Sequence, residues 1–182
     1  LLLLTSSFAY GQDWPELGRY FENNKKYAQS SDNENRVVFM GNSITEGWST
    51  ILPEFFKGKS YINRGISGQT TPQMLIRFRP DVIDLNPKVV VILAGINDIA
   101  ENTGPSTVKM ISDNIISMAD LAKINGINVI ISSILPAKGF PWNPGINPPP
   151  KISAVNKIIE QYAKENGMIY LDYYSSMVDK NN

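Results

Sequence analysis

The chain has 182 residues, a length that suits one domain with a sizeable hydrophobic core. Its 17 basic and 17 acidic residues balance without a long run of either sign, so bulk charge gives no support for nucleic-acid or anionic-membrane binding. It contains no cysteine and no histidine, which excludes disulfides, thiolate metal sites, a cysteine nucleophile and an imidazole base. We expect neither a metal nor a cofactor.

The first eleven residues resemble the end of a signal peptide. The apolar run 1–4 precedes the small residues Ala9 and Gly11, a spacing that is typical of a cleavage site and predicts Gln12 as the mature N-terminus. Eleven residues are too few to span a bilayer. We therefore expect a signal-peptide remnant over 1–11, one domain over 12–182 and a periplasmic or secreted protein. An amphipathic or buried first helix is the alternative.

Apolar periodicity and turn residues predict alternating helices and strands along the rest of the chain. In chain order we expect a helix over 14–27, a strand over 36–40, a helix from 43, a strand over 61–63, a helix over 71–78 that Pro80 kinks or breaks, a strand over 89–94, a helix over 106–125, a strand over 128–135, a proline-rich loop over 136–150, a helix over 151–166 and a strand over 168–173. This alternation favours right-handed βαβ crossovers around a parallel sheet.

Three glycine-containing turns each follow an apolar run of strand length. They are Gly41-Asn42-Ser43, the turn at Gly65, and 95–98, which contains Asn97. Because the carboxyl ends of parallel strands face one crevice, we expect these turns to converge. Ser43 would supply a nucleophilic hydroxyl and an amide at a helix N-terminus, Gly65 a bare backbone amide, and Asn97 a carboxamide that cannot titrate.

Each of these residues also has a purely structural interpretation. Ser43 could cap a helix, Gly65 could serve a turn that needs positive φ, and Asn97 could form an Asx-turn. Asp98 is expected to organise its loop by accepting backbone amides. Trp48 and Trp142 could line a sugar- or acyl-binding crevice, or could pack the proline-rich loop onto the domain.

Three segments together resemble the sequence blocks of SGNH hydrolases, also called GDSL-type esterases and lipases. They are VFMGNSITEGW over 38–48, NRGISGQTT over 63–71 and AGIND over 94–98. The resemblance covers nearly everything from 36 to 175 and is greatest to platelet-activating-factor acetylhydrolase-like proteins and carbohydrate O-acetylesterases. It implies a flavodoxin-like α/β/α sandwich with a five-stranded parallel sheet in the order 2-1-3-4-5. It also implies Ser43 as nucleophile, and the amides of Ser43 and Gly65 with the Asn97 side chain as the oxyanion hole.

The chain departs from the family pattern at two places. Asn42 stands where the family name has aspartate, which is tolerable because that position is not the nucleophile. The family's last block, Asp-x-x-His, is absent: Asp172 has no histidine three residues later and is expected to organise a loop instead. We therefore expect a C-terminally truncated chain that lacks its base and its last helix, leaving part of one sheet face uncovered.

The resemblance implies a serine ester hydrolase that acts on short-chain acyl or acetyl esters of carbohydrates or small molecules, without cofactor or metal. Because a serine without a partner base is a weak nucleophile, the 182-residue chain is expected to be nearly inactive. The alternative is a noncatalytic carbohydrate-binding relative that has lost the base. The sequence leaves the oligomeric state undetermined.

Overall fold

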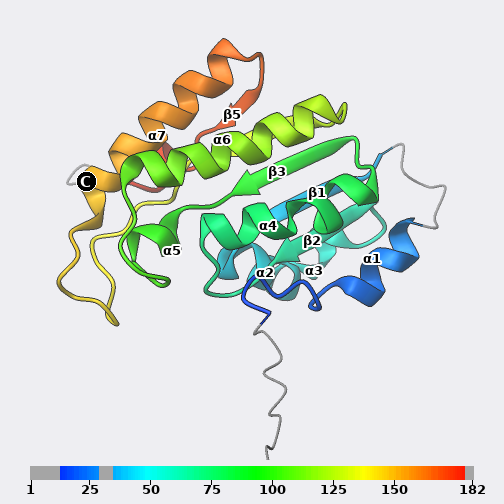
Figure 1. The fold of residues 1–182 in the computed structure, drawn as a ribbon, viewed down its shortest axis with the longest axis horizontal. Coiled ribbons are helices and arrows are strands. Elements are labelled where there is room, and N and C mark those ends of the chain that lie inside the picture. Colours follow the sequence, from blue (N-terminus) through cyan, green and yellow to red (C-terminus); the bar gives the residue numbers. More distant parts are fainter. Residues whose placement is uncertain (1–12, 29–34, 179–182) are drawn as a thin grey trace, which may run out of the picture.

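The computed structural model describes residues 13–28 and 35–178. The segment 1–11, for which the sequence predicts a signal-peptide remnant, lies outside the described residues. Five parallel strands form one sheet in the order β2-β1-β3-β4-β5, which confirms the expected topology (Figure 1). The strands are β1 (Val37–Gly41), β2 (Tyr61–Gly65), β3 (Val89–Leu93), β4 (Asn128–Ser132) and β5 (Ile169–Leu171).

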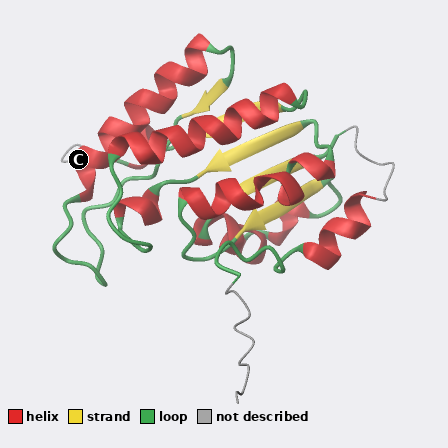
Figure 2. Cartoon of the chain, in the orientation of Figure 1, coloured by secondary structure: helices red, strands yellow, loops and turns green. Residues whose placement is uncertain are grey.

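Helices cover both faces of this sheet, giving the expected three layers (Figure 2). The described helices are α1 (Phe21–Ala28), α2 (Ser43–Ile51), α3 (Pro53–Phe56), α4 (Thr71–Asp81), the 3₁₀ turn η1 (Ile83–Leu85), α5 (Ile96–Ile99), α6 (Val108–Ile124), α7 (Pro148–Glu165) and α8 (Tyr174–Met177). Within the described part of the chain, none of them is long and apolar enough to cross a bilayer.

The main hydrophobic core lies between the sheet and the row formed by α4, α6 and α7. Alternate strand residues such as Val38, Met40 and Ile92 point into it and are at most 1% exposed, as expected for a parallel sheet covered on both faces. The opposite face carries an aromatic cluster around Phe39, whose ring centroid lies 5.4–5.8 Å from those of four neighbours: Trp48, Phe55, Phe56 and Tyr61.

Several element boundaries differ from the sequence expectation; among the strands, β4 ends at Ser132 instead of 135, and β5 is limited to Ile169–Leu171. Residues 14–20 form turns, and the first helix begins only at Phe21. Proline at 148 begins α7 three residues earlier than expected, because its fixed φ suits a first helical turn. Pro80 lies within the last turn of α4, which ends one residue later at Asp81, so the predicted break falls at the helix end.

Part of the sheet face on the α2 side is open. Ile169 in β5 is 60% exposed and Ile130 in β4 is only half-buried. These two residues belong to the strands farthest from β1 and β2, against which α2 packs. Apolar side chains of β4 and β5 are therefore partly exposed on this face.

Two glycines allow α2 to approach the ends of β1 and β2 very closely. A Cβ atom at Gly65 would stand 2.1 Å from Glu46 N and 2.6 Å from Glu46 Cα, which are helix backbone atoms. A Cβ atom at Gly41 would stand 2.1 Å from Thr45 Oγ1 and 2.8 Å from Leu93 O. Glycine is thus required at both positions for the first turn of α2 to lie on the sheet.

A buried carboxylate connects the turn after β3 to α4. Asp98 in α5 is 1% exposed, and its oxygens accept hydrogen bonds from Thr71 N at 2.9 and 3.0 Å and from Thr71 Oγ1 at 2.6 Å. Asp98 thus accepts a backbone amide, as predicted, but the amide belongs to the start of α4 and not to the loop that carries Asp98. Burial raises the pKa of Asp98 to about 6, although the hydrogen bonds from Thr71 act to lower it.

The Gly65→Ala variant should be less stable than the wild-type chain by about 2–3 kcal/mol, because the new methyl group collides with helix backbone that cannot rotate away. Urea unfolding measures this loss. Gly145→Ala is the matched control, since its added Cβ meets no atom within 4 Å. Equal midpoints for the two variants would contradict the packing role of Gly65.

Asp98→Asn should change how stability depends on pH. The folded protein holds the Asp98 proton up to about pH 6, whereas the unfolded chain releases it near the ordinary aspartate pKa of 3.8. Wild-type stability should therefore fall between about pH 4 and pH 6, by up to about 3 kcal/mol from this group alone. Urea unfolding at several pH values should show that the Asp98→Asn variant lacks this slope; parallel pH profiles for both proteins would refute it.

Candidate active site

Ser43 is the first residue of α2 and follows the carboxyl end of β1. Asn42, not Ser43, caps the helix: Asn42 Oδ1 accepts a hydrogen bond from Ile44 N at 3.0 Å. Ser43 is exposed, and its hydroxyl has no hydrogen-bond partner among residues 13–28 and 35–178. The unpaired amides of a helix N-terminus favour negative charge beside this hydroxyl.

The second turn departs from the arrangement expected at Gly65. Gly65 N already donates a hydrogen bond to Asn63 Oδ1 at 2.8 Å, so this amide is occupied within the protein. Gly65 is also buried beneath the first turn of α2. The glycine at 65 is explained by helix packing, and the geometry does not support the expected approach of an acyl oxygen to its amide.

A free backbone donor lies three residues later, in the turn from Ile66 to Gln69. Gln69 N bonds Ile66 O at 3.4 Å, and Gly68 has a φ of +76°, the geometry that favours glycine at this position of a tight turn. Gly68 is exposed, and its N–H has no acceptor in the described part of the chain. Sequence reasoning missed Gly68, although its position in the Ser-Gly-Gln turn was the available signal.

Glu46 holds this second turn against α2. One carboxylate oxygen of Glu46 accepts a hydrogen bond from Ser67 N at 2.9 Å, and the other pairs with Arg19 Nη2 at 2.7 Å. Because Glu46 lies one turn after Ser43 on the same helix, the contact fixes the Ile66–Ser67 peptide, which directly precedes the peptide that carries Gly68 N, relative to the start of α2.

Asn97 brings the third turn to the second. It lies in the first turn of α5, after Gly95, whose φ of +113° requires glycine. Asn97 is 7% exposed, and its Nδ2 donates to Gln69 O at 3.0 Å. A carboxamide nitrogen carries two hydrogens, so one N–H remains available for a ligand. Asn97 therefore contacts the residue that follows Gly68.

An apolar cavity of about 300 Å³ opens beside the start of α2. Its wall includes three residues spaced along one side of that helix, and the full lining is Ile44, Trp48, Ile51, Leu93, Leu135, Tyr173 and Met177. Trp48 also stacks on Phe55 with ring centroids 4.8 Å apart. The position of Trp48 is compatible with the crevice lining that the sequence suggested; its ring contacts are made with Phe39, Phe55 and Phe56, which do not belong to the proline-rich loop.

Trp142 lies on the proline-rich loop and is 64% exposed. Its ring packs at 5.3 Å from that of Phe140, which is buried. Trp142 Nε1 donates to Asn102 Oδ1 at 3.3 Å, and Asn102 Nδ2 donates to Gly68 O at 3.2 Å. Asn102 therefore links the loop that carries Trp142 to the turn that carries Gly68.

Asp172 follows β5 and organises the chain there, as expected. Its Oδ1 accepts a hydrogen bond from Ser175 N at 3.0 Å, and the Ser175 hydrogen bonds lower the pKa of Asp172. Within the described residues no group of three or more histidine, cysteine, aspartate or glutamate side chains could hold a metal ion. The groups that gather at the strand ends are a hydroxyl, amides and apolar side chains.

Comparison with known proteins agrees with these features. The model of the GDSL-like lipase/acylhydrolase family matches residues 39–182. A solved GDSL-like lipase from Bacteroides thetaiotaomicron VPI-5482 is 52% identical, with a TM-score of 0.88 over 92% of this chain and 82% of that chain.

Two curated proteins are more distant. The arylesterase of Vibrio mimicus is 30% identical over 118 residues, or 58% of this chain and 57% of the relative. The lipoprotein YqeF of Bacillus subtilis (strain 168) is 27% identical over 123 residues, or 65% of this chain and 51% of the relative. The chain thus spans about half the length of the curated relatives it matches. With a family model matched over most of its length, the chain belongs to the GDSL-like lipase/acylhydrolase family.

Proposed function

We propose that Ser43 is the nucleophile of a serine ester hydrolase. The observation that carries this proposal is the exposed hydroxyl of Ser43 at the N-terminus of α2, which is not used to cap the helix. It lies at the same end of the sheet as two turns that present free N–H donors. Glu46 holds the Gly68 turn to α2, and Asn97 contacts the same turn through Gln69 O. Acyl transfer needs this combination of a nucleophile and fixed donors.

In the proposed reaction, Ser43 Oγ attacks the carbonyl carbon of the ester and gives up its proton. The carbonyl oxygen becomes an oxyanion that accepts hydrogen bonds from Ser43 N, Gly68 N and Asn97 Nδ2. We assign Gly68 in place of Gly65 because Gly65 N is already bonded to Asn63. The C–O bond to the alcohol then breaks, and the alcohol leaves with a proton taken from the solvent or buffer, so that the acyl group remains on Ser43. Water then attacks this acyl group, which releases the carboxylic acid and restores the Ser43 hydroxyl.

The proton acceptor is the unusual part of this proposal. The 182 residues contain no histidine, and no described carboxylate bonds to Ser43. In this chain the proton must therefore pass to water or to a base in the buffer. Loss of the histidine from a serine hydrolase lowers turnover by on the order of a millionfold, so we propose that this chain is nearly inactive unless a base is added.

For substrates, we propose short-chain acyl or acetyl esters of carbohydrates or small molecules. The apolar cavity beside Ile44 and Trp48 would hold the acyl group, and the exposed Trp142 would contact the alcohol part. We also propose that the protein acts outside the cytoplasm. The leader-like residues 1–11 support this, and the similar protein of Bacillus subtilis is a lipoprotein.

Ser43→Ala tests the nucleophile. With p-nitrophenyl acetate, the wild-type chain should acquire an acetyl group on Ser43 at least about tenfold faster than on other exposed serines, because only Ser43 has oxyanion donors beside it. Peptide mass mapping measures this. Imidazole added to the buffer should raise p-nitrophenol release by wild type above that of the Ser43→Ala variant, since it can accept the proton.

Ser153→Ala is the matched control, because Ser153 is an exposed serine on α7. It should behave as wild type in both measurements. If Ser43 is acetylated no faster than Ser153, or if the Ser43→Ala variant releases p-nitrophenol as fast as wild type at every imidazole concentration, Ser43 is not the nucleophile. Binding of oligosaccharides without acyl transfer would then favour the noncatalytic alternative.

A further inference from the structure

Arg77 in α4 is a charged side chain with no exposed surface. Removing a guanidinium from water is costly unless its N–H groups are bonded. Burial lowers the pKa of Arg77, while Asp81 acts in the opposite direction and favours the charged form. The strand order does not require a buried arginine in α4, and Arg77 takes no part in the proposed reaction.

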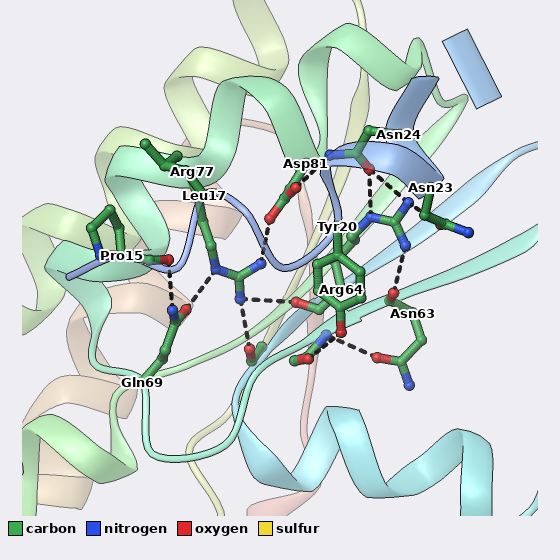
Figure 3. Close-up of polar contacts among 12 residues, drawn as sticks. Pro15, Leu17, Tyr20, Asn23, Asn24, Asn63, Arg64, Gln69, Arg77 and Asp81 are labelled. Atoms are coloured by element: carbon green, nitrogen blue, oxygen red, sulfur yellow. Dashed lines mark hydrogen bonds and ion pairs between the residues drawn. The ribbon is translucent and has the colours of Figure 1, made fainter. Parts of the chain in front are cut away.

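The hydrogen bonds of Arg77 reach three separate parts of the chain (Figure 3). Nη2 donates to Gly41 O at 3.1 Å and to Arg64 O at 2.9 Å. Nε donates to Gln69 Oε1 at 2.6 Å, and Nη1 pairs with Asp81 Oδ2 at 2.8 Å. Only the last of these contacts lies within α4.

The other three acceptors lie at the carboxyl ends of β1 and β2 and in the turn that contains Gly68. Gly41 is two residues before Ser43 at the end of β1, and Arg64 precedes Gly65 at the end of β2. Gln69 follows Gly68 directly, and its backbone oxygen accepts the hydrogen bond from Asn97 Nδ2. A single guanidinium therefore bonds to the turn before Ser43 and to the turn that contains Gly68 and contacts Asn97.

We infer that Arg77 is a positioning residue that sets the distance between Ser43 and the oxyanion donors, an inference that rests on the proposed function. A guanidinium is planar and its donors point in fixed directions, so the three acceptors cannot move independently. A misplacement of about 1 Å between reacting groups can lower a rate by on the order of a hundredfold. Small shifts of these turns therefore matter for acyl transfer.

A second set of contacts holds the same turn from the N-terminal segment. Gln69 Nε2 donates to Pro15 O at 2.8 Å, and the Tyr20 hydroxyl donates to Gly65 O. Asn24 Nδ2 bonds Asp81 Oδ1 at 2.7 Å, which orients the carboxylate toward Arg77. Gln69 and Asp81, the two side-chain partners of Arg77, are thus themselves held in place (Figure 3).

Arg77→Lys separates positioning from charge. Lysine keeps the positive charge, but a single ammonium group cannot reproduce the fork that reaches Gly41 O, Arg64 O and Gln69 Oε1. Acetylation of Ser43 by p-nitrophenyl acetate should fall at least about tenfold relative to wild type, while acetylation of Ser153 stays unchanged. Peptide mass mapping of both sites in one digest gives the ratio, and circular dichroism establishes that the variant is folded at the assay temperature.

Asp81→Asn is the control for stability alone. It removes the ion pair but leaves the three hydrogen bonds of Arg77 to the turns in place. The melting temperature should therefore fall, while the ratio of Ser43 acetylation to Ser153 acetylation stays within about twofold of wild type. If the Arg77→Lys protein is unfolded, Gln69→Met replaces it: this variant removes one of the bonds and should lower the ratio several-fold.

The outcomes distinguish this inference from the proposed function. A wild-type chain without preferential acetylation of Ser43 refutes the nucleophile, and the inference falls with it. Preferential acetylation that persists in a folded Arg77→Lys protein, or in Gln69→Met, overturns the positioning role alone. The positioning role would also be overturned if the ratio of Ser43 to Ser153 acetylation fell in both Arg77→Lys and Asp81→Asn in proportion to the fall in melting temperature. Stability would then explain the effect.

Discussion

The close approach of the first turn of α2 to the ends of β1 and β2 is the constraint on which the rest of the site depends. Two glycines permit it, since a Cβ atom at Gly41 or Gly65 would overlap atoms of that turn. The approach places Ser43, the first residue of α2, just past the end of β1 and lets Glu46 reach Ser67 N. A helix held farther from the sheet would lose that contact and separate Ser43 from the turn that contains Gly68.

Buried polar groups then determine how the three turns sit relative to one another. Arg77 joins the ends of β1 and β2 to Gln69, Asn97 joins the turn after β3 to the same residue, and Asp98 joins that turn to the start of α4. Buried hydrogen bonds of this kind contribute little net stability each but are costly to break. They favour one arrangement of the turns over others that an apolar core would tolerate.

The contrast between Gly65 and Gly68 shows how one short segment divides its tasks. Gly65 is buried, has its amide bonded to Asn63 Oδ1 and serves helix packing. Gly68 is exposed, has positive φ and leaves its amide free of any acceptor in the described chain. Both are glycines in the same block over 63–71, and the sequence pattern alone does not distinguish a glycine needed for helix packing from one needed for a positive-φ turn.

The sequence by itself determined the order of strands and helices, because apolar runs such as 89–94 and the helical period of 106–125 are local patterns. It also determined that Ser43 follows a strand, that Asn97 follows another, and that no imidazole is present in the 182 residues. Tertiary structure decided what local patterns cannot encode: that Asn42 rather than Ser43 caps α2, and that the Gly65 amide is occupied. It also decided that Arg77 joins turns from different strands. Each of these three contacts depends on partners that come together only when the sheet forms.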